Sequence, residues 1–354
     1  MTADVFFRVV LALGVVVVSG RLLGRAAAAI GQPPVIGEVL SGIMLGPSLL
    51  GLAAPGAQAY LFPDAVKPAL GVVAHLGVLL YMFLVGLEFD TGLLKRRTAS
   101  LVVTSQASIV VPFALGYALA LPLYDAFAPE GVSRTVFALF MGVAMSITAF
   151  PVLARILADR GLTRSELGVA SLACAAINDV MAWCLLALVV GTTRAMPSGG
   201  VPGELVIAFA LGVLIPHHSA FALSAIAWLN GVVTILLLPA FFALTGLRTQ
   251  IGLVSTPYEW AACALIILAA TAGKFGGAAL AGRWMGMSWG FAGRLGALMN
   301  TRGLIELVVL TIGLDAGLIS PTLFTMMVIM ALVTTAMTTP LLTLIEAAED
   351  RREQ

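Results

Sequence analysis

Apolar stretches of about twenty residues follow one another along almost the whole chain, and this pattern limits the possible folds more than any other feature. A helix needs roughly 20 residues to cross the hydrocarbon core of a bilayer, where main-chain groups cannot bond to water. We expect spanning helices at about residues 5–23, 30–50, 70–90, 99–122, 135–158, 165–190, 219–246, 258–281, 291–313 and 320–346. With a shorter stretch at 204–215, the sequence predicts an all-α polytopic membrane protein of about 11 transmembrane segments.

Composition favours a single membrane transport domain over residues 1–354. Hydrophobic residues make up 60% of the chain and charged residues 10%, with a mean hydropathy of +1.05, whereas soluble domains are about 25% charged. Few residues follow the last apolar stretch, so we expect no C-terminal regulatory domain. The net charge of +1 gives no reason to expect a nucleic-acid partner. The sequence has no His/Cys cluster, phosphate loop or nucleophile motif, so we expect neither an enzyme nor a cofactor.

The positions of Lys and Arg predict the orientation. If the N-terminus is outside, most of these residues fall on the inner side: Arg21, Arg25, Lys95, Arg96, Arg97, Arg155, Arg160, Arg164, Arg283, Arg294, Arg351 and Arg352. This distribution agrees with the positive-inside rule. We therefore predict a multi-pass protein of the cell (inner) membrane, with the N-terminus outside and the C-terminus inside.

A short motif occurs twice. Val85-Gly86-Leu87, followed by Gly92-Leu93, returns as Thr245-Gly246-Leu247, followed by Gly252-Leu253. Both copies end a predicted helix, on opposite sides of the membrane, which is typical of the inverted repeats of transporters. We expect repeat one at about 1–190 and a shortened repeat two at about 203–346. Chance is the alternative, because Gly-Leu pairs are common in membrane helices.

Each repeat also contains a helix that is interrupted near its middle. Pro151 lies inside the 135–158 segment, where it removes a main-chain hydrogen bond. Gly303 lies inside the 291–313 segment, at the end of the run Asn300-Thr301-Arg302. Broken helices are tolerated in a membrane where they are buried in protein or line a watery cavity, so the pair points to a midplane binding site. A proline kink plus a polar helix contact is the alternative.

Asp179 is the most informative single residue. It has about a dozen residues of apolar helix on each side, where an unpaired carboxylate is costly and the protonated form is favoured. Asn178 precedes it, and Thr148 lies at the first helix break. Together they offer hard oxygen ligands that suit a proton or a monovalent cation rather than a transition metal. The alternative is a buried aspartate that only holds helices together.

Other charges also fall inside predicted helices. Lys274 lies among small residues and could turn inward, or its stem could reach the interface. Arg302 and Glu306 have the i, i+4 spacing of a pair on one helix, and a role in gating is equally open. Glu38 and Glu88 are interpreted as interfacial or helix-packing charges.

The motifs as a set resemble the monovalent cation/proton antiporter superfamily. They are Pro34-Val35-Ile36-Gly37-Glu38, Phe83-Leu84-Val85-Gly86-Leu87-Glu88, Thr148-Ala149-Phe150-Pro151-Val152-Leu153, Asn178-Asp179 and Asn300-Thr301-Arg302-Gly303-Leu304-Ile305-Glu306. The last is similar to the branch that contains Kef-type transporters and plant cation/H⁺ exchangers. The resemblance implies a homodimeric elevator-type transporter with crossed broken helices, in which Asp179 carries the ion or proton and Lys274 is the family's basic residue. This chain lacks two central helices that family members carry between the aspartate helix and residue 203.

The function that we expect is exchange of Na⁺ or K⁺ for protons, both competing for Asp179, in the service of pH homeostasis. A Kef-like K⁺ efflux channel and a transport-inactive regulatory or assembly subunit are the alternatives. Because Asn178 stands where relatives carry a second aspartate, we expect one-for-one exchange. In that case Lys274 would pair with Glu306 or reach the interface, and it would stay charged throughout the cycle. If Lys274 were neutral instead, it could bind a proton during the cycle, and exchange would then carry net charge.

Overall fold

The computed structural model describes residues 3–88, 99–191, 201–216 and 219–353, and these residues form helices and connecting loops without a strand. By length and composition, eight helices in this part of the chain could each cross a membrane. They run over Ala3–Ala29, Pro34–Ala53, Lys67–Leu84, Ala99–Phe127, Glu166–Leu186, Ala220–Leu253, Pro257–Trp284 and Pro321–Glu349. The predicted all-α polytopic membrane class is therefore confirmed.

Some helices continue past their predicted ends. Helix α1 (Ala3–Ala29) continues beyond residue 23 through a run of alanines, the strongest helix formers. Helix α18 (Pro321–Glu353) continues beyond residue 346, because its charged end is held by ion pairs. Apolar stretches show where a helix crosses a membrane, but they do not show where it stops.

The stretch predicted at 204–215 is helix α11 (Val201–Leu214), with 14 residues. At about 1.5 Å per residue it is roughly 21 Å long, less than the 30 Å or so of a hydrocarbon core. It follows residues 192–200, which lie outside the described residues. The number of spans and their orientation stay predictions.

Both predicted helix interruptions are present. The first segment forms α8 (Arg134–Ser146) and α9 (Phe150–Asp159), with Pro151 in the first turn of α9. The second forms α16 (Trp289–Met299) and α17 (Leu304–Asp315), with Gly303 at the N-cap. A Cβ atom on Gly303 would lie 2.6 Å from Val152 Cγ2, so a larger residue here would have to displace the Val152 side chain of the first broken helix.

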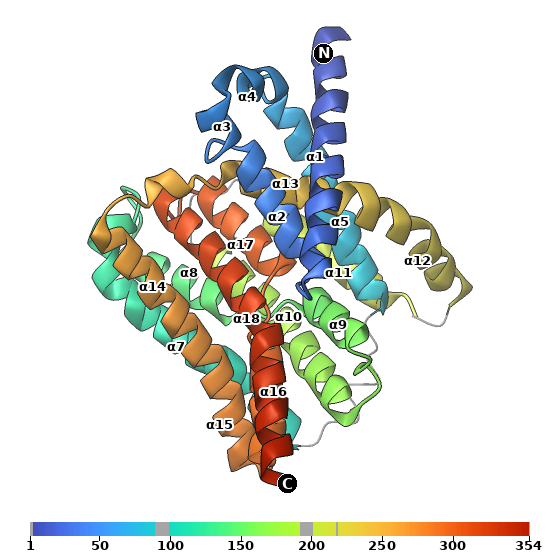
Figure 1. Ribbon diagram of the computed structural model, residues 1–354, viewed down its shortest axis with the longest axis vertical. Helices are drawn as coiled ribbons and strands as arrows, with labels where there is room; N and C mark the ends of the chain where they lie inside the picture. The colour runs from blue at the N-terminus through green and yellow to red at the C-terminus, as the bar shows by residue number, and fades with distance from the viewer. Residues whose placement is uncertain (1–2, 89–98, 192–200, 217–218, 354) are drawn as a thin grey trace. The chain divides into compact units, whose positions relative to one another are not determined.

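The chain forms two compact units, each of which takes helices from both predicted repeats (Figure 1). Unit 1 is formed by residues 1–90 and 198–253, and unit 2 by residues 91–197 and 254–354. Unit 1 contains α1, α2 (Pro34–Leu45), α3 (Leu50–Ala53), α4 (Pro55–Leu61), α5 (Lys67–Glu88), α11, α12 (Ala220–Val232), the π-helix η1 (Val233–Leu237), α13 (Leu238–Arg248) and the short 3₁₀-helix η2 (Ile251–Leu253). Unit 2 contains α7 (Ala99–Phe127), α8, α9, α10 (Glu166–Gly191), α14 (Pro257–Thr271), the π-helix η3 (Ala272–Gly276), α15 (Gly277–Trp284), α16, α17 and α18.

The glycines of the repeated motif allow close helix contacts in unit 1. A Cβ atom on Gly86 of α5 would lie 2.3 Å from the carbonyl oxygen of Phe209 in α11. A Cβ atom on Gly246 of α13 would lie 2.4 Å from the carbonyl oxygen of Val39 in α2. Such small residues let membrane helices pack main chain against main chain. The boundaries of the two repeats stay predictions.

Candidate functional site

Asp179 lies in the middle of α10 and is almost completely buried in unit 2, with 3% of its surface exposed. Neither carboxylate oxygen has a hydrogen-bond partner among the described residues. The Lys274 ammonium and the N–H of Phe150, at the start of α9, act on this carboxylate electrostatically. A helix N-terminus carries a partial positive charge, so both neighbours favour an anion. Asp179 is therefore a buried carboxylate whose oxygens are free to bind.

The two helix breaks meet beside this helix. The N–H of Ala149 in the first break donates to the carbonyl oxygen of Thr301 in the second, at 3.0 Å. The Thr148 hydroxyl donates more weakly to the carbonyl oxygen of Met299, at 3.4 Å. These bonds satisfy main-chain groups that the missing helical turns leave open, so each break stabilises the other. The residues alone place each break on its own helix, and the contact between the two breaks agrees with the crossed broken helices that the resemblance implies.

Asn178 connects α10 to the first break and to α7. Its side-chain amide lies 3.0 Å from the Thr148 hydroxyl, 2.9 Å from the Ser108 hydroxyl and 3.0 Å from the Ser105 hydroxyl. All four side chains are buried. Sequence reasoning named Asn178 and Thr148 but missed the serines. The signal for them is a group of hydroxyl residues at 104, 105 and 108 inside an otherwise apolar helix.

Lys274 points inward. It lies in the π-helical turn η3, is fully buried, and donates a hydrogen bond from Nζ to Thr148 Oγ1 at 2.6 Å. Gly273 precedes it, and a Cβ atom there would lie 2.8 Å from Pro112 Cα, so the turn packs directly on α7. The alternative in which Lys274 reaches the interface is wrong, because its side chain is enclosed. Within the described residues, Nζ also makes no ion pair with Glu306, which bonds to Arg302 instead.

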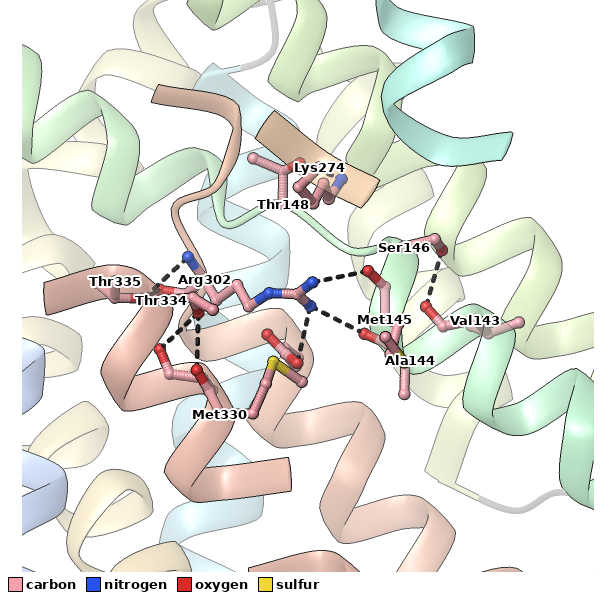
Figure 2. Close-up of polar contacts among 12 residues, drawn as sticks. Val143, Ala144, Met145, Ser146, Thr148, Lys274, Arg302, Met330, Thr334 and Thr335 are labelled. Atoms are coloured by element: carbon pink, nitrogen blue, oxygen red, sulfur yellow. Dashed lines mark hydrogen bonds and ion pairs between the residues drawn. The ribbon is translucent and has the colours of Figure 1, made fainter. Parts of the chain in front are cut away.

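Arg302 joins the second break to the end of α8 (Figure 2). Its guanidinium donates to the carbonyl oxygens of Ala144 at 3.3 Å and Met145 at 2.8 Å, and to the Glu306 carboxylate at 3.0 Å. Arg302 and Glu306 are both fully buried. The last carbonyls of a helix have no partner within it and carry partial negative charge. Arg302 therefore neutralises the partial negative charge at the broken end of α8. The i, i+4 spacing of Arg302 and Glu306 in the sequence does not reveal this contact with α8.

Threonines of α18 hold the main chain of the second break. The Thr335 hydroxyl accepts from the N–H of Arg302 at 3.0 Å and donates to its carbonyl oxygen at 2.8 Å. The Asn300 amide donates to the carbonyl oxygen of Thr334 at 3.4 Å. Figure 2 shows Thr334 and Thr335 beside Arg302. The sequence signal that was missed is a threonine pair inside an apolar helix.

Comparison with known proteins identifies the family. The sequence profile described as "Sodium/hydrogen exchanger, transmembrane" matches residues 14–207 and 197–344. The chain belongs to this family. It is 39% identical to the protein named Na⁺/H⁺ antiporter NhaS4 of Synechocystis, over 92% of this chain and 94% of that protein. It is 34% identical to cation/H⁺ antiporter 17 of Arabidopsis thaliana, over 94% of this chain but 47% of that protein.

A solved structure shows the same fold as this exchanger. The sodium/proton antiporter MjNhaP1 of Methanocaldococcus jannaschii aligns over 97% of both chains with a TM-score of 0.65, at 14% sequence identity. This likeness supports the inverted-repeat antiporter fold with two discontinuous helices that the sequence predicts.

The exchanger also lacks residues that its Synechocystis relative contains. The alignment with the Synechocystis protein runs over 386 positions, more than the 354 residues of this chain, so that relative contains residues without a counterpart here. The two profile matches overlap at residues 197–207, next to the predicted gap.

Two further predicted charges can be placed only in part. Glu38 lies in α2 and is half-buried, and a Cβ atom on Gly24 of α1 would lie 3.5 Å from its Cγ atom. Its stem therefore packs between two helices of unit 1, as a helix-packing charge would. The Glu88 side chain lies outside the described residues.

Proposed function

We propose that this exchanger moves a monovalent cation, Na⁺ or K⁺, against protons, and that both compete for the Asp179 carboxylate. One observation carries the proposal: the two Asp179 oxygens are buried beside the meeting point of two broken helices and bond to no described residue. The names of the Synechocystis and plant relatives support the activity.

Competition at one carboxylate is enough to couple the two fluxes. A bare buried carboxylate is costly, whereas a proton or a cation neutralises it. If only a neutralised site passes between the two sides of the membrane, each cation that leaves must be replaced by a proton. Asn178 and Thr148 supply neutral oxygen atoms that an alkali cation needs as further ligands. A proton needs only the carboxylate.

Lys274, Arg302 and Glu306 have supporting roles in this proposal. Arg302 and Glu306 bond to each other and to the end of α8, so they hold the broken helices in place. Lys274 donates to Thr148 and acts on Asp179 electrostatically. It is therefore placed to respond to whether Asp179 carries a proton, a cation or neither.

Transport by purified protein in liposomes tests the proposal. With a pH-sensitive dye inside, addition of Na⁺, K⁺ or Li⁺ should move protons in the wild type. Asp179→Asn keeps the side-chain shape and removes the titrating group, so it should abolish this movement. Asp125→Asn is the matched control, because Asp125 is exposed and pairs with Arg134 away from the site.

Three results would contradict the proposal. Exchange at the wild-type rate in a correctly inserted Asp179→Asn variant would exclude Asp179 as the carrier. Cation flux that continues without any proton movement would favour a K⁺ efflux channel. A wild-type protein that binds no cation would favour a regulatory or assembly subunit. This alternative is worth testing because the chain lacks residues that the Synechocystis protein contains.

The assembly and the membrane are also part of the proposal. The resemblance to elevator-type antiporters supports a homodimer, embedded in the lipid bilayer of the cell membrane. Chemical cross-linking in intact membranes should give a dimer band, and a band at the monomer position alone at every cross-linker concentration would count against the homodimer.

A further inference from the structure

The α7 hydroxyl groups are the part of this site to which the exchange mechanism gives no role. Ser105 and Ser108 are fully buried and contact the Asn178 amide at 3.0 Å and 2.9 Å. Thr104 is the neighbour of Ser105 on the same helix and is also fully buried, but its hydroxyl has no hydrogen-bond partner among the described residues. The helix therefore carries two hydroxyls that contact Asn178 and one that does not.

The Asn178 amide fits among these hydroxyls in two orientations, which exchange its oxygen and nitrogen atoms. In the first, Nδ2 donates to Ser108 and Thr148, and Oδ1 accepts from Ser105. In the second, Oδ1 accepts from the Ser108 and Thr148 hydroxyls, and Nδ2 donates to Ser105 Oγ and to the carbonyl oxygens of Ser105 and Cys174. The second orientation uses more of the hydrogen-bonding capacity of the amide.

The Lys274 ammonium also favours the second orientation. It donates to Thr148 Oγ1 at 2.6 Å, so the Thr148 oxygen already accepts one strong bond. In the first orientation the same oxygen would accept from Nδ2 as well, which would use both of its lone pairs and leave none for a cation. In the second, the Thr148 hydroxyl donates to Asn178 Oδ1 at 3.0 Å, and its other acceptor is the Met299 carbonyl oxygen at 3.4 Å. A cation that binds would turn this hydrogen from Oδ1 to Met299, which leaves one lone pair on Oδ1 and one on Thr148 Oγ1 for the cation.

We propose that Ser105 and Ser108 are positioning residues, which hold Asn178 Oδ1 toward Thr148 so that an amide oxygen and a hydroxyl oxygen together serve as cation ligands beside Asp179. The two serines act through Asn178 and do not touch the cation. They set the affinity for the cation rather than for the proton, because protonation of Asp179 needs no further ligands. This inference rests on the proposed function, in which Asp179 binds the cation.

The variants Ser105→Ala and Ser108→Ala test the inference, with Thr104→Val as the matched control. Each serine variant removes one hydrogen bond that fixes the amide, so the KM for the cation should rise about two- to tenfold. The kcat and the pH profile at saturating cation should stay at wild-type values. Thr104→Val removes a buried hydroxyl from the same helix without affecting the amide, so it should leave the KM unchanged.

Cation binding without transport gives a second measurement. A cation that binds the folded protein raises its melting temperature in a concentration-dependent way. In detergent at fixed ionic strength, the concentration of Na⁺ or K⁺ that gives half of the shift should rise for both serine variants and not for Thr104→Val. Because this measurement does not require transport, it also gives the cation affinity of a serine variant that folds but does not transport.

The inference fails if both serine variants match Thr104→Val in KM and in the melting-temperature titration. It also fails if they lower kcat and leave the KM unchanged, because that result would indicate a purely structural role. Failure of the proposed function is distinguishable, since it would leave exchange intact in Asp179→Asn or give a wild type that no cation stabilises.

Discussion

Arg302 is the side chain whose removal should destabilise unit 2 most. Arg302→Met keeps a long, flexible side chain but removes the bonds to Ala144, Met145 and Glu306. Two buried carbonyls left without a partner cost about 1–3 kcal/mol each, and breaking a buried ion pair costs about 3–5 kcal/mol. These contributions overlap because they share one guanidinium. We therefore expect the free energy of unfolding to fall by at least about 3 kcal/mol.

Thermal unfolding in one detergent, followed by the fluorescence of the native tryptophans, measures this loss. Glu306→Gln should cost less than Arg302→Met, because the guanidinium keeps both carbonyls and the glutamine oxygen can still accept from it. The double variant should recover part of the loss of Arg302→Met, since no unpaired carboxyl remains. Arg155→Gln is the control, because Arg155 and Asp159 form the same i, i+4 pair with side chains 60% and 54% exposed.

The order of the unfolding temperatures of these variants shows which contacts of Arg302 matter most. If Glu306→Gln unfolds at a lower temperature than Arg302→Met, the ion pair rather than the bonds to α8 dominates. If Arg302→Met unfolds at the same temperature as the control Arg155→Gln, Arg302 has no structural role. The broken end of α8 must then be stabilised by another group.

Three further predictions concern orientation, packing and charge movement. Single cysteines at positions 96 and 130 should react with a membrane-impermeant reagent from the cytoplasm and from outside, respectively, and labelling of both from one side would show that the predicted topology is wrong. Gly246→Ala should destabilise the protein by about 1–3 kcal/mol in thermal unfolding, because the new Cβ would lie 2.4 Å from the Val39 carbonyl oxygen; Gly14→Ala, with nothing within 4 Å of its Cβ, is the control. The exchange rate should depend on membrane potential in the wild type and become insensitive to it in Lys274→Gln, and equal dependence in the two proteins would exclude Lys274 as a second proton carrier.

The sequence predicted the helices and their breaks because a bilayer leaves few choices. Main-chain groups in hydrocarbon must be paired, so about twenty apolar residues in succession indicate a helix. A proline at 151 and a glycine at 303 interrupt such stretches at places where no loop could be exposed to lipid. The helix ends at residues 29 and 353 were not predicted, because the ends lie where water and ion pairs act instead.

The interior of the site was predicted only in part, because its contacts join residues that are far apart in the sequence. Ser105 and Asn178 are separated by 73 residues, and Lys274 and Thr148 by 126. Helical periodicity assigns each side chain to a face of its own helix but does not say which helix packs there. Asp179 was identified without this information because a carboxylate so deep in an apolar helix is unusual by itself. Serines and threonines are common in membrane helices, so the hydroxyl residues at 104, 105 and 108 and the threonine pair at 334 and 335 did not stand out in the sequence.

The buried charges of unit 2 explain why transport should respond to membrane potential. Arg302 and Glu306 bond to each other, so their charges cancel within the pair. Lys274 then stands opposite Asp179, without an ion-pair partner of its own among the described residues. When a cation neutralises Asp179, an ammonium at Lys274 is left uncompensated in a low-dielectric interior, which is costly. Loss of the Lys274 proton at that step would make the buried site electrically neutral again. The predicted one-for-one exchange assumed that Lys274 pairs with Glu306 or reaches the interface, and the enclosed ammonium on Thr148 fits neither arrangement. If Lys274 takes up a proton again and returns with it while Asp179 carries another, two protons cross for each cation, and exchange carries net charge across the membrane.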